Sequence, residues 1–155
     1  MALVLVPISP DQLADWADTG ILAGPRPGYA VTPGLRSAFA PSDEEEAEHI
    51  AALVASIAAL AATGHRLVAV VECSPRPDTT ADPDFGGVTV PDLAWASVQS
   101  LFADAPDAEG LPEAASAAAG LSLTQAWDLP EVVRLLAEAD LLWHGAGEWR
   151  QLGTG

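Results

Sequence analysis

The sequence predicts a single α/β domain, with a mixed α+β arrangement as the alternative, built on a mixed sheet of four or five strands with helices packed against it. Two continuous apolar segments, residues 3–8 and 66–72, are short enough to be strands buried on both faces. A long segment between them has apolar residues at helical spacing. The length of 155 residues, half of them hydrophobic and 18% charged, suits one domain with a sizeable core.

The first strand leads into a short helix. Ser9 is followed by Pro10 and, three residues after the cap, by Gln12, a pattern typical of a capping box at a helix start. Gly20 ends this helix. Residues 20–34 are rich in glycine and proline and predict an ordered loop with a short extended segment, which leads to a brief helix over 35–39.

The clearest predicted element is a long helix from Asp43 to Thr63. Ser42 and Glu45 match a capping box, and Gly64 provides the stop. Apolar residues recur at helical spacing at Ile50, Leu53, Val54, Ile57, Leu60 and Ala61, and we expect all of them except Ala61 to face the sheet. Strand, helix and strand in this order predict a right-handed crossover that leaves the first two strands parallel.

The second half of the chain alternates between loops and short elements. Residues 74–87 predict a long polar loop, and residues 97–102 alternate as a half-exposed strand does, with a helix through Trp95, Val98, Leu101 and Phe102 as the alternative. The other predicted elements are an extended segment at 88–90, a turn at 104–110, a helix at 112–119, a helix from a capping box of Asp128 and Glu131 to Asp140, a strand at 141–144 and a helical turn at 148–152. The domain therefore covers 1–152, with 153–155 as a frayed tail.

The charge balance limits the partners that this chain can take. Lysine is absent, and six arginines face 22 acidic residues, for a formal net charge of −16. Such a surface repels nucleic-acid phosphates and acidic lipid head groups, so we expect neither a nucleic-acid nor a membrane partner. The start of the chain lacks the basic leader of a secretion signal, and the single cysteine excludes an internal disulfide, which together predict a cytoplasmic protein of undetermined oligomeric state.

Three segments together resemble a small family of uncharacterised actinobacterial proteins. They are residues 30–36 (AVTPGLR) with the acidic run 43–46, residues 98–107, which run from a strand into Asp-Ala-Pro-Asp, and Leu141-Leu142-Trp143 with Glu148 and Leu152 beyond. The resemblance implies a single mixed α/β domain, and it implies no catalytic activity.

Few residues suggest catalysis, and the sequence predicts no cofactor and no metal site. Cys73 follows a predicted parallel strand and opens the 74–87 loop, and His65 and His144 are the available bases, so an alternative reading is a small-molecule enzyme with its site there. A buried structural cysteine is the simpler interpretation. Asp78, Asp82 and Asp84 lack the spacing of a calcium loop. Arg26 and Arg36 can in principle hold a small anion, although arginines in so acidic a chain are expected to pair with carboxylates first.

The acidic helix start points instead to a protein partner. The predicted docking residues are Asp43, Glu44, Glu45, Glu46 and Glu48, with Trp149 as an aromatic contact. We therefore expect a non-catalytic protein that acts through a basic protein partner, an immunity-like or inhibitor-like role being one variant.

Overall fold

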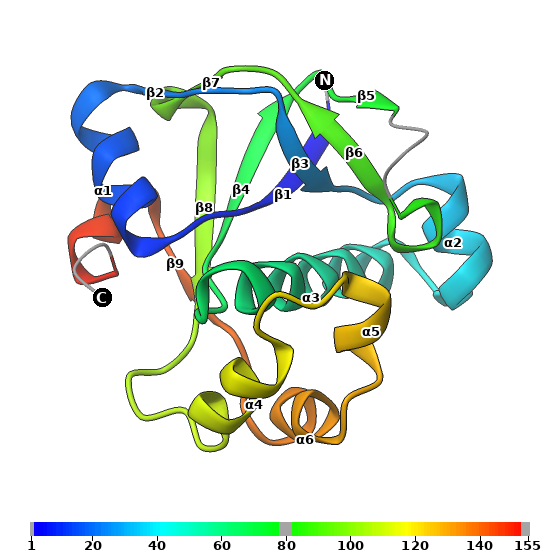
Figure 1. The fold of residues 1–155 in the computed structure, drawn as a ribbon. Helices are drawn as coiled ribbons and strands as arrows, with labels where there is room; N and C mark the ends of the chain where they lie inside the picture. The colour runs from blue at the N-terminus through cyan, green and yellow to red at the C-terminus, as the bar shows by residue number, and fades with distance from the viewer. Residues whose placement is uncertain (1, 78–81, 153–155) are drawn as a thin grey trace.

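An antiparallel sheet of seven strands organises the fold, in the order β5-β6-β3-β1-β4-β8-β9 (Figure 1). The computed structural model describes residues 2–77 and 82–152. The strands of this sheet are β1 (Ala2–Pro7), β3 (Arg26–Tyr29), β4 (Val68–Cys73), β5 (Arg76–Pro77), β6 (Gly87–Val90), β8 (Val98–Ala103) and β9 (Leu142–His144), and a second sheet pairs β2 (Ile21–Leu22) with β7 (Leu93–Ala94). The expected mixed α/β domain is confirmed, whereas the expected four or five strands are too few.

Helices cover both faces of the large sheet. The α-helices are α1 (Pro10–Thr19), α2 (Pro33–Phe39), α3 (Glu44–Thr63), α4 (Leu111–Ala118), α5 (Leu123–Trp127) and α6 (Pro130–Glu138), and the 3₁₀ turns are η1 (Pro83–Phe85), η2 (Trp95–Ser97) and η3 (Ala146–Gln151). Alternate residues of β1 define the two layers: Val4 and Val6 pack with α1, while Leu5 packs with α3. Figure 1 shows α3 crossing one face, with α4, α5 and α6 gathered beneath it.

The expected parallel pairing of the first two long strands is wrong. β1 and β4 are antiparallel, with Ala2 opposite Cys73 and Pro7 opposite Val68. On its other side β1 pairs with β3, and this pairing is also antiparallel. Because β3 and β4 both run against β1, they run in the same direction as each other. The crossover through α3 therefore joins β3 to β4 across β1, which is a split βαβ arrangement.

β3 is difficult to predict from the sequence because its residues are Arg-Pro-Gly-Tyr, and proline and glycine usually mark loops. Gly28 is required there by close packing, since a Cβ at this position would lie 2.7 Å from Cγ1 of Val4. Pairing with β6 fixes the strand on its other side, with Arg26 opposite Val90. The expected short extended segment in residues 20–34 is thus a central strand.

The long helix is confirmed, but its start differs by one residue. The N-cap of α3 is Asp43, whose side chain accepts a hydrogen bond from the backbone N–H of Glu46. Its inner face consists of small and branched residues, including Ala51, Val54, Ile57 and Leu60, all with no exposed surface. Leu53, expected on this inner face, is only half-buried, and its outward position matters for the site described below.

The C-terminal half contains one helix that the pattern analysis did not predict. Ser122 and Gln125 form a capping box for α5, and Asp128 is the residue that ends this helix. The expected capping box of Asp128 and Glu131 is therefore wrong, because α6 starts with Pro130 after Leu129. The strand reading of residues 97–102 is confirmed by β8, and the helical alternative is limited to the single turn η2.

Part of the 74–87 loop is ordered as β5, η1 and the start of β6. Residues 78–81 and the expected tail at 153–155 lie outside the described residues. One helix of the described chain, α3, is long and apolar enough by composition to cross a membrane, and half of its most apolar window is buried inside the protein. Its packing against the sheet is that of a core helix.

Candidate functional site

A cleft of about 850 Å³ opens on the α3 face of the sheet. α3 covers only part of this face of the sheet. The floor of the cleft consists of strand residues, among them Leu3 near the start of β1, Val70 of β4 and Phe102 of β8. The cleft is closed on one side by the N-terminal half of α3 and on the other by the residues after α6. Its lining residues are Ala2, Leu3, Leu5, Ala30, Val31, Glu44, Glu45, Glu48, His49, Ala52, Leu53, Val70, Ser100, Phe102, Leu136, Ala139, Asp140, Leu141 and Trp143.

Large apolar side chains in this cleft remain exposed. Trp143 is 63% exposed and Leu3 is 45% exposed, although both belong to strands of the sheet. Trp143 lies opposite Phe102 on the edge strand β9, so its indole extends the apolar floor outward. Exposed aromatic and aliphatic groups that gather in a concave site are typical of binding surfaces.

Four carboxylates stand around this apolar floor: Glu44, Glu45, Glu48 and Asp140. Glu44 forms an ion pair with Arg36 of α2. Within the described part of the chain, no ion pair or side-chain hydrogen bond involves the carboxylates of Glu45, Glu48 and Asp140. The site therefore combines an apolar floor with an uncompensated negative rim, and such a rim attracts cations.

The other two predicted docking acids are engaged at the helix start. Asp43 caps α3, as described above. The carboxylate of Glu46 accepts hydrogen bonds from the backbone N–H and the hydroxyl of Ser42, and these two bonds lower its pKa. The five predicted acids thus divide into two that hold the helix start, one that is paired with Arg36, and two that face the cleft unpaired.

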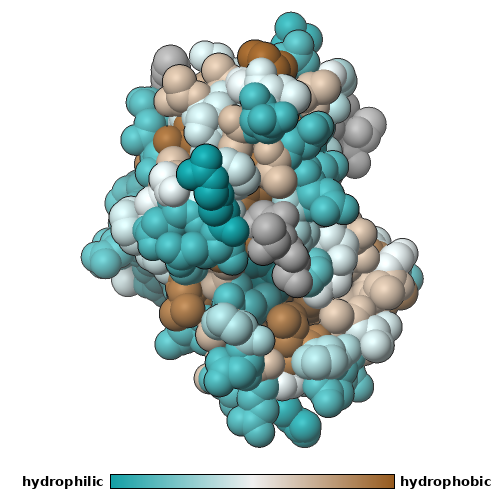
Figure 2. All heavy atoms as spheres, turned by 90° about the vertical axis from the view of Figure 1, so that its left-hand side faces the viewer, coloured by the Kyte–Doolittle hydropathy of each residue, from teal (hydrophilic) through white to brown (hydrophobic). Residues whose placement is uncertain are grey.

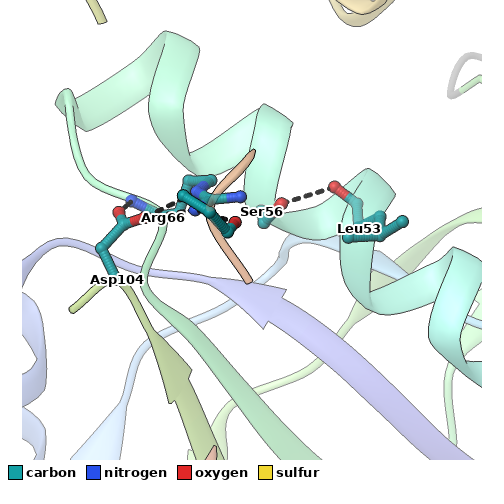
Figure 3. Close-up of polar contacts among 5 residues, drawn as sticks. Leu53, Ser56, Arg66 and Asp104 are labelled. Atoms are coloured by element: carbon teal, nitrogen blue, oxygen red, sulfur yellow. Dashed lines mark hydrogen bonds and ion pairs between the residues drawn. The ribbon is translucent and has the colours of Figure 1, made fainter. Parts of the chain in front are cut away.

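A buried ion pair holds the wall of the cleft beside Asp140. Arg66 follows α3 and has no exposed side-chain surface, and its Nε donates to Oδ1 of Asp104 at 2.7 Å. Nη2 of Arg66 also donates to the backbone carbonyl of Ala139 at 2.8 Å, one residue before Asp140. Figure 3 shows Arg66 between Asp104, at the end of β8, and the α3 residues Ser56 and Leu53. The pair therefore ties the segment after α6 to α3 and to the sheet.

The three candidate catalytic residues do not come together. Cys73 ends β4 and is 8% exposed, and burial raises the pKa of its thiol. His65 is exposed before the other end of this six-residue strand, a separation of about 20 Å along the strand. His144 lies on β9 two strands away, opposite Leu101, and its Nδ1 is 3.8 Å from the carboxylate of Glu148. Because β4 is antiparallel to both of its neighbours, Cys73 also lacks the position at the carboxyl end of a parallel strand that first suggested reactivity.

Trp149 lies away from the cleft. It is half-buried on the α1 face, where its ring packs edge-on against Trp95 with centroids 6.5 Å apart, and Arg150 covers it at 4.9 Å. The tryptophan that faces the cleft is Trp143, which the sequence places in a short apolar strand and so does not distinguish from a core residue. Its exposure follows from the position of β9 at the edge of the sheet, where Leu142 and Trp143 are both exposed.

Within residues 2–77 and 82–152, no group of three or more histidine, cysteine, aspartate or glutamate side chains is arranged to hold a metal ion. In the acidic loop considered for calcium, Asp82 is the N-cap of η1, Asp84 lies within η1, and Asp78 lies outside the described residues. The face that carries α1 and the C-terminal segment is mostly hydrophilic, with apolar residues confined to separate patches (Figure 2).

The fold and the cleft together define a mixed α/β domain with an acidic and apolar cleft. The chain belongs to a family of unknown function, DUF6912, whose model matches residues 3–152. The match covers the cleft apart from Ala2 and includes all three segments on which the resemblance rested, so membership of an uncharacterised family is confirmed. No curated protein matches the chain, and no solved structure matches it.

Proposed function

We propose that this protein is a non-catalytic binding protein whose cleft holds a basic segment of a protein partner. The observation that carries the proposal is the coincidence, in one cleft, of the unpaired carboxylates of Glu45 and Glu48 with the exposed Trp143 and Leu3. Burial of these apolar groups would supply affinity, and the carboxylates would select positive charge.

A polypeptide segment fits these features because it can carry both kinds of group on neighbouring residues. Arginine is the best match, since its guanidinium pairs with carboxylates through two parallel hydrogen bonds and also stacks on aromatic faces such as that of Trp143. The chain-wide charge of −16 would in addition speed the encounter with a basic surface. An immunity-like or inhibitor-like protein that covers a basic partner is one form of this proposal.

The separation of Cys73, His65 and His144 supports a non-catalytic role, because nucleophile and base need hydrogen-bond contact in the reacting complex. The proposal includes a cytoplasmic location, where this protein would compete with nucleic acid for a partner that carries a basic patch. The same negative field would keep nucleic acid and acidic membranes away from the cleft.

Site-specific photo-crosslinking in a cell lysate tests this proposal. A photoreactive phenylalanine at His49, an exposed position of α3 in the cleft, is compared with one at Asp15, an exposed position of α1 on the other face of the sheet. We expect basic proteins to be captured from His49 alone, and we expect Glu45→Gln with Glu48→Gln to abolish the capture. Capture of nucleic acid, or of the same proteins from both positions, would contradict the proposal.

A further inference from the structure

A second cavity, of about 540 Å³, lies at the other end of α3 and is independent of the acidic cleft. It is formed where the last turn of α3 approaches the start of β3, the N-terminus of α1 and the N-terminus of α5. The polar residues of its lining that matter here are Ser9, Gln12, Arg26, Tyr29, Asp82 and Ser122.

The distinctive group in this cavity is the guanidinium of Arg26. Its Nε is buried and has no hydrogen-bond acceptor, and no carboxylate of the described chain forms an ion pair with it. Among the described residues, its one side-chain hydrogen bond is a long one of 3.4 Å from Nη2 to Oε1 of Gln12, an oxygen that already accepts from the backbone N–H of Ser9 at 2.9 Å. Burial lowers the pKa of Arg26, as expected for a charge that has lost water without gaining an anion.

This situation is unusual because Arg26 is one of two arginines in the described chain that are not exposed, the other being Arg66. Arg36 pairs with Glu44 and Arg66 pairs with Asp104, as arginines in such surroundings are expected to do. A partly desolvated guanidinium with a buried, unpaired Nε costs free energy unless an oxyanion meets it. The empty space in front of Arg26 is therefore a place where an anionic ligand would complete the hydrogen bonding.

Other groups in the cavity define the chemistry of that ligand. Burial and the neighbouring Asp82 raise the pKa of Tyr29 to about 12, so its phenol stays protonated and can donate. Ser9 and Ser122 accept backbone hydrogen bonds as helix caps, which leaves their hydroxyl protons free to donate as well. Much of the remaining lining is apolar, with Ala58, Ala61, Leu121 and Leu123 among it.

We infer that this cavity binds a small organic acid with one carboxylate and an apolar body. The planar guanidinium of Arg26 pairs with the carboxylate, and the tyrosine and serine hydroxyls complete its hydrogen bonds. The alanine and leucine side chains contact the apolar body. The carboxylate of Asp82 repels a second negative charge, so a singly charged acid binds better than a phosphate dianion.

Titrations of the full chain, followed by the NMR signals of the Arg26 and Tyr29 side chains, test this inference with three probes: hexanoate, hexanol and inorganic phosphate. We expect saturable binding of hexanoate, with hexanol and phosphate each weaker by about tenfold or more, since a charged hydrogen bond is worth roughly that factor. Arg26→Gln should weaken hexanoate binding by about tenfold or more. Arg134→Gln, which removes the same charge from an exposed site on α6, should leave it unchanged.

Ala58→Met provides a second variant that keeps Arg26 and fills the apolar part of the cavity, and it should also weaken hexanoate binding. Equal hexanoate affinity in the wild type and in a folded Arg26→Gln variant would overturn the inference. So would equal affinity for hexanoate and hexanol, or the absence of saturable hexanoate binding. The two cavities share no lining residue, so none of these results depends on the acidic cleft. A negative result here would therefore leave the proposed function of the cleft untouched, and the reverse also holds.

Discussion

At the scale of single residues, the neighbours of each acidic side chain at the start of α3 decide what it can bind. Asp43 and Glu46 are occupied by backbone groups and by Ser42, while Glu45 and Glu48 face the cleft without a partner. The sequence identifies all of them as acids near a helix N-terminus, where they also favour the helix dipole. It does not separate the helix-capping acids from the cleft acids, because that division depends on which side of the helix remains uncovered.

The same limit applies to the tryptophans and to Cys73. The apolar run before Cys73 correctly indicates a buried strand. The exposure of Trp143, however, depends on β9 being an edge strand beside an open part of the sheet, and strand order is not encoded in local periodicity.

Cys73 should behave as a structural thiol. Its side chain is buried and its pKa is raised, so little thiolate forms near neutral pH and reagents reach it poorly. We predict slow alkylation of the native protein and rapid alkylation after denaturation, measured by mass spectrometry. Rapid alkylation of the native protein well below the usual thiol pKa of about 8.5 would show an activated cysteine.

The buried pair of Arg66 and Asp104 should be a strong determinant of stability. Asp104→Ala would leave the Arg66 guanidinium buried without its counter-charge, which typically costs about 3–5 kcal/mol. The measurement is the free energy of unfolding from chemical denaturation. Asp107→Ala, an exposed change in the same loop, is the matched control, and equal effects of the two substitutions would show that the ion pair has no special role.

At the scale of elements, α3 has two apolar sides with different purposes. One side, with Val54, Ile57 and Leu60, packs on the sheet, and the other presents Leu53 to the cleft. Helical periodicity finds the helix and its limits to within a residue, since capping and the final glycine are local signals. It assigns Leu53 to the core because it cannot show that the sheet extends beyond the helix.

The missed strand β3 has a comparable cause. Its proline and glycine match the tight packing of β3 between β1 and β6, which only the assembled sheet reveals. When β3 is absent from the prediction, the crossover through α3 is assigned to β1 and β4. In the structure it joins β3 to β4. Because this one short strand was not predicted, the expected sheet is partly parallel, whereas the observed sheet is antiparallel.

Alanine substitutions on the two sides of α3 should separate folding from binding. Ile57→Ala should reduce the free energy of unfolding by about 2–5 kcal/mol, because it leaves a cavity in the core. Leu53→Ala should cost only about 1 kcal/mol, since its side chain is half-buried. Chemical denaturation of both variants measures the difference, and a larger loss for Leu53→Ala would show that the two sides were assigned wrongly.

At the scale of the whole molecule, some of the acidic side chains hold the structure, whereas others line the cleft without a partner among the described residues. Six arginines against 22 acidic residues leave most carboxylates without a cation, so the molecule as a whole carries a net negative field. Only in the cleft does this field coincide with exposed Trp143 and Leu3. The net charge can be calculated from the sequence. The grouping of carboxylates with exposed apolar side chains in one cleft is seen only in the folded structure.

The central claim is that this cleft recognises positive charge and apolar groups together. The most direct measurement is the binding of a short fluorescent peptide that alternates arginine and leucine, followed by anisotropy, with two control peptides. One control replaces each arginine with glutamine, and the other replaces each leucine with serine. The protein variants are Glu45→Gln with Glu48→Gln in the cleft, and Asp15→Asn with Asp18→Asn on α1, which remove the same charge from the other face.

We predict that the arginine–leucine peptide binds more tightly than either control peptide, and that its binding weakens as salt rises. The cleft variant should lose about tenfold or more in affinity, and the α1 variant should lose far less. Equal losses in the two variants would show that the peptide senses only the overall charge, and this result would contradict the assignment of the cleft as the binding site.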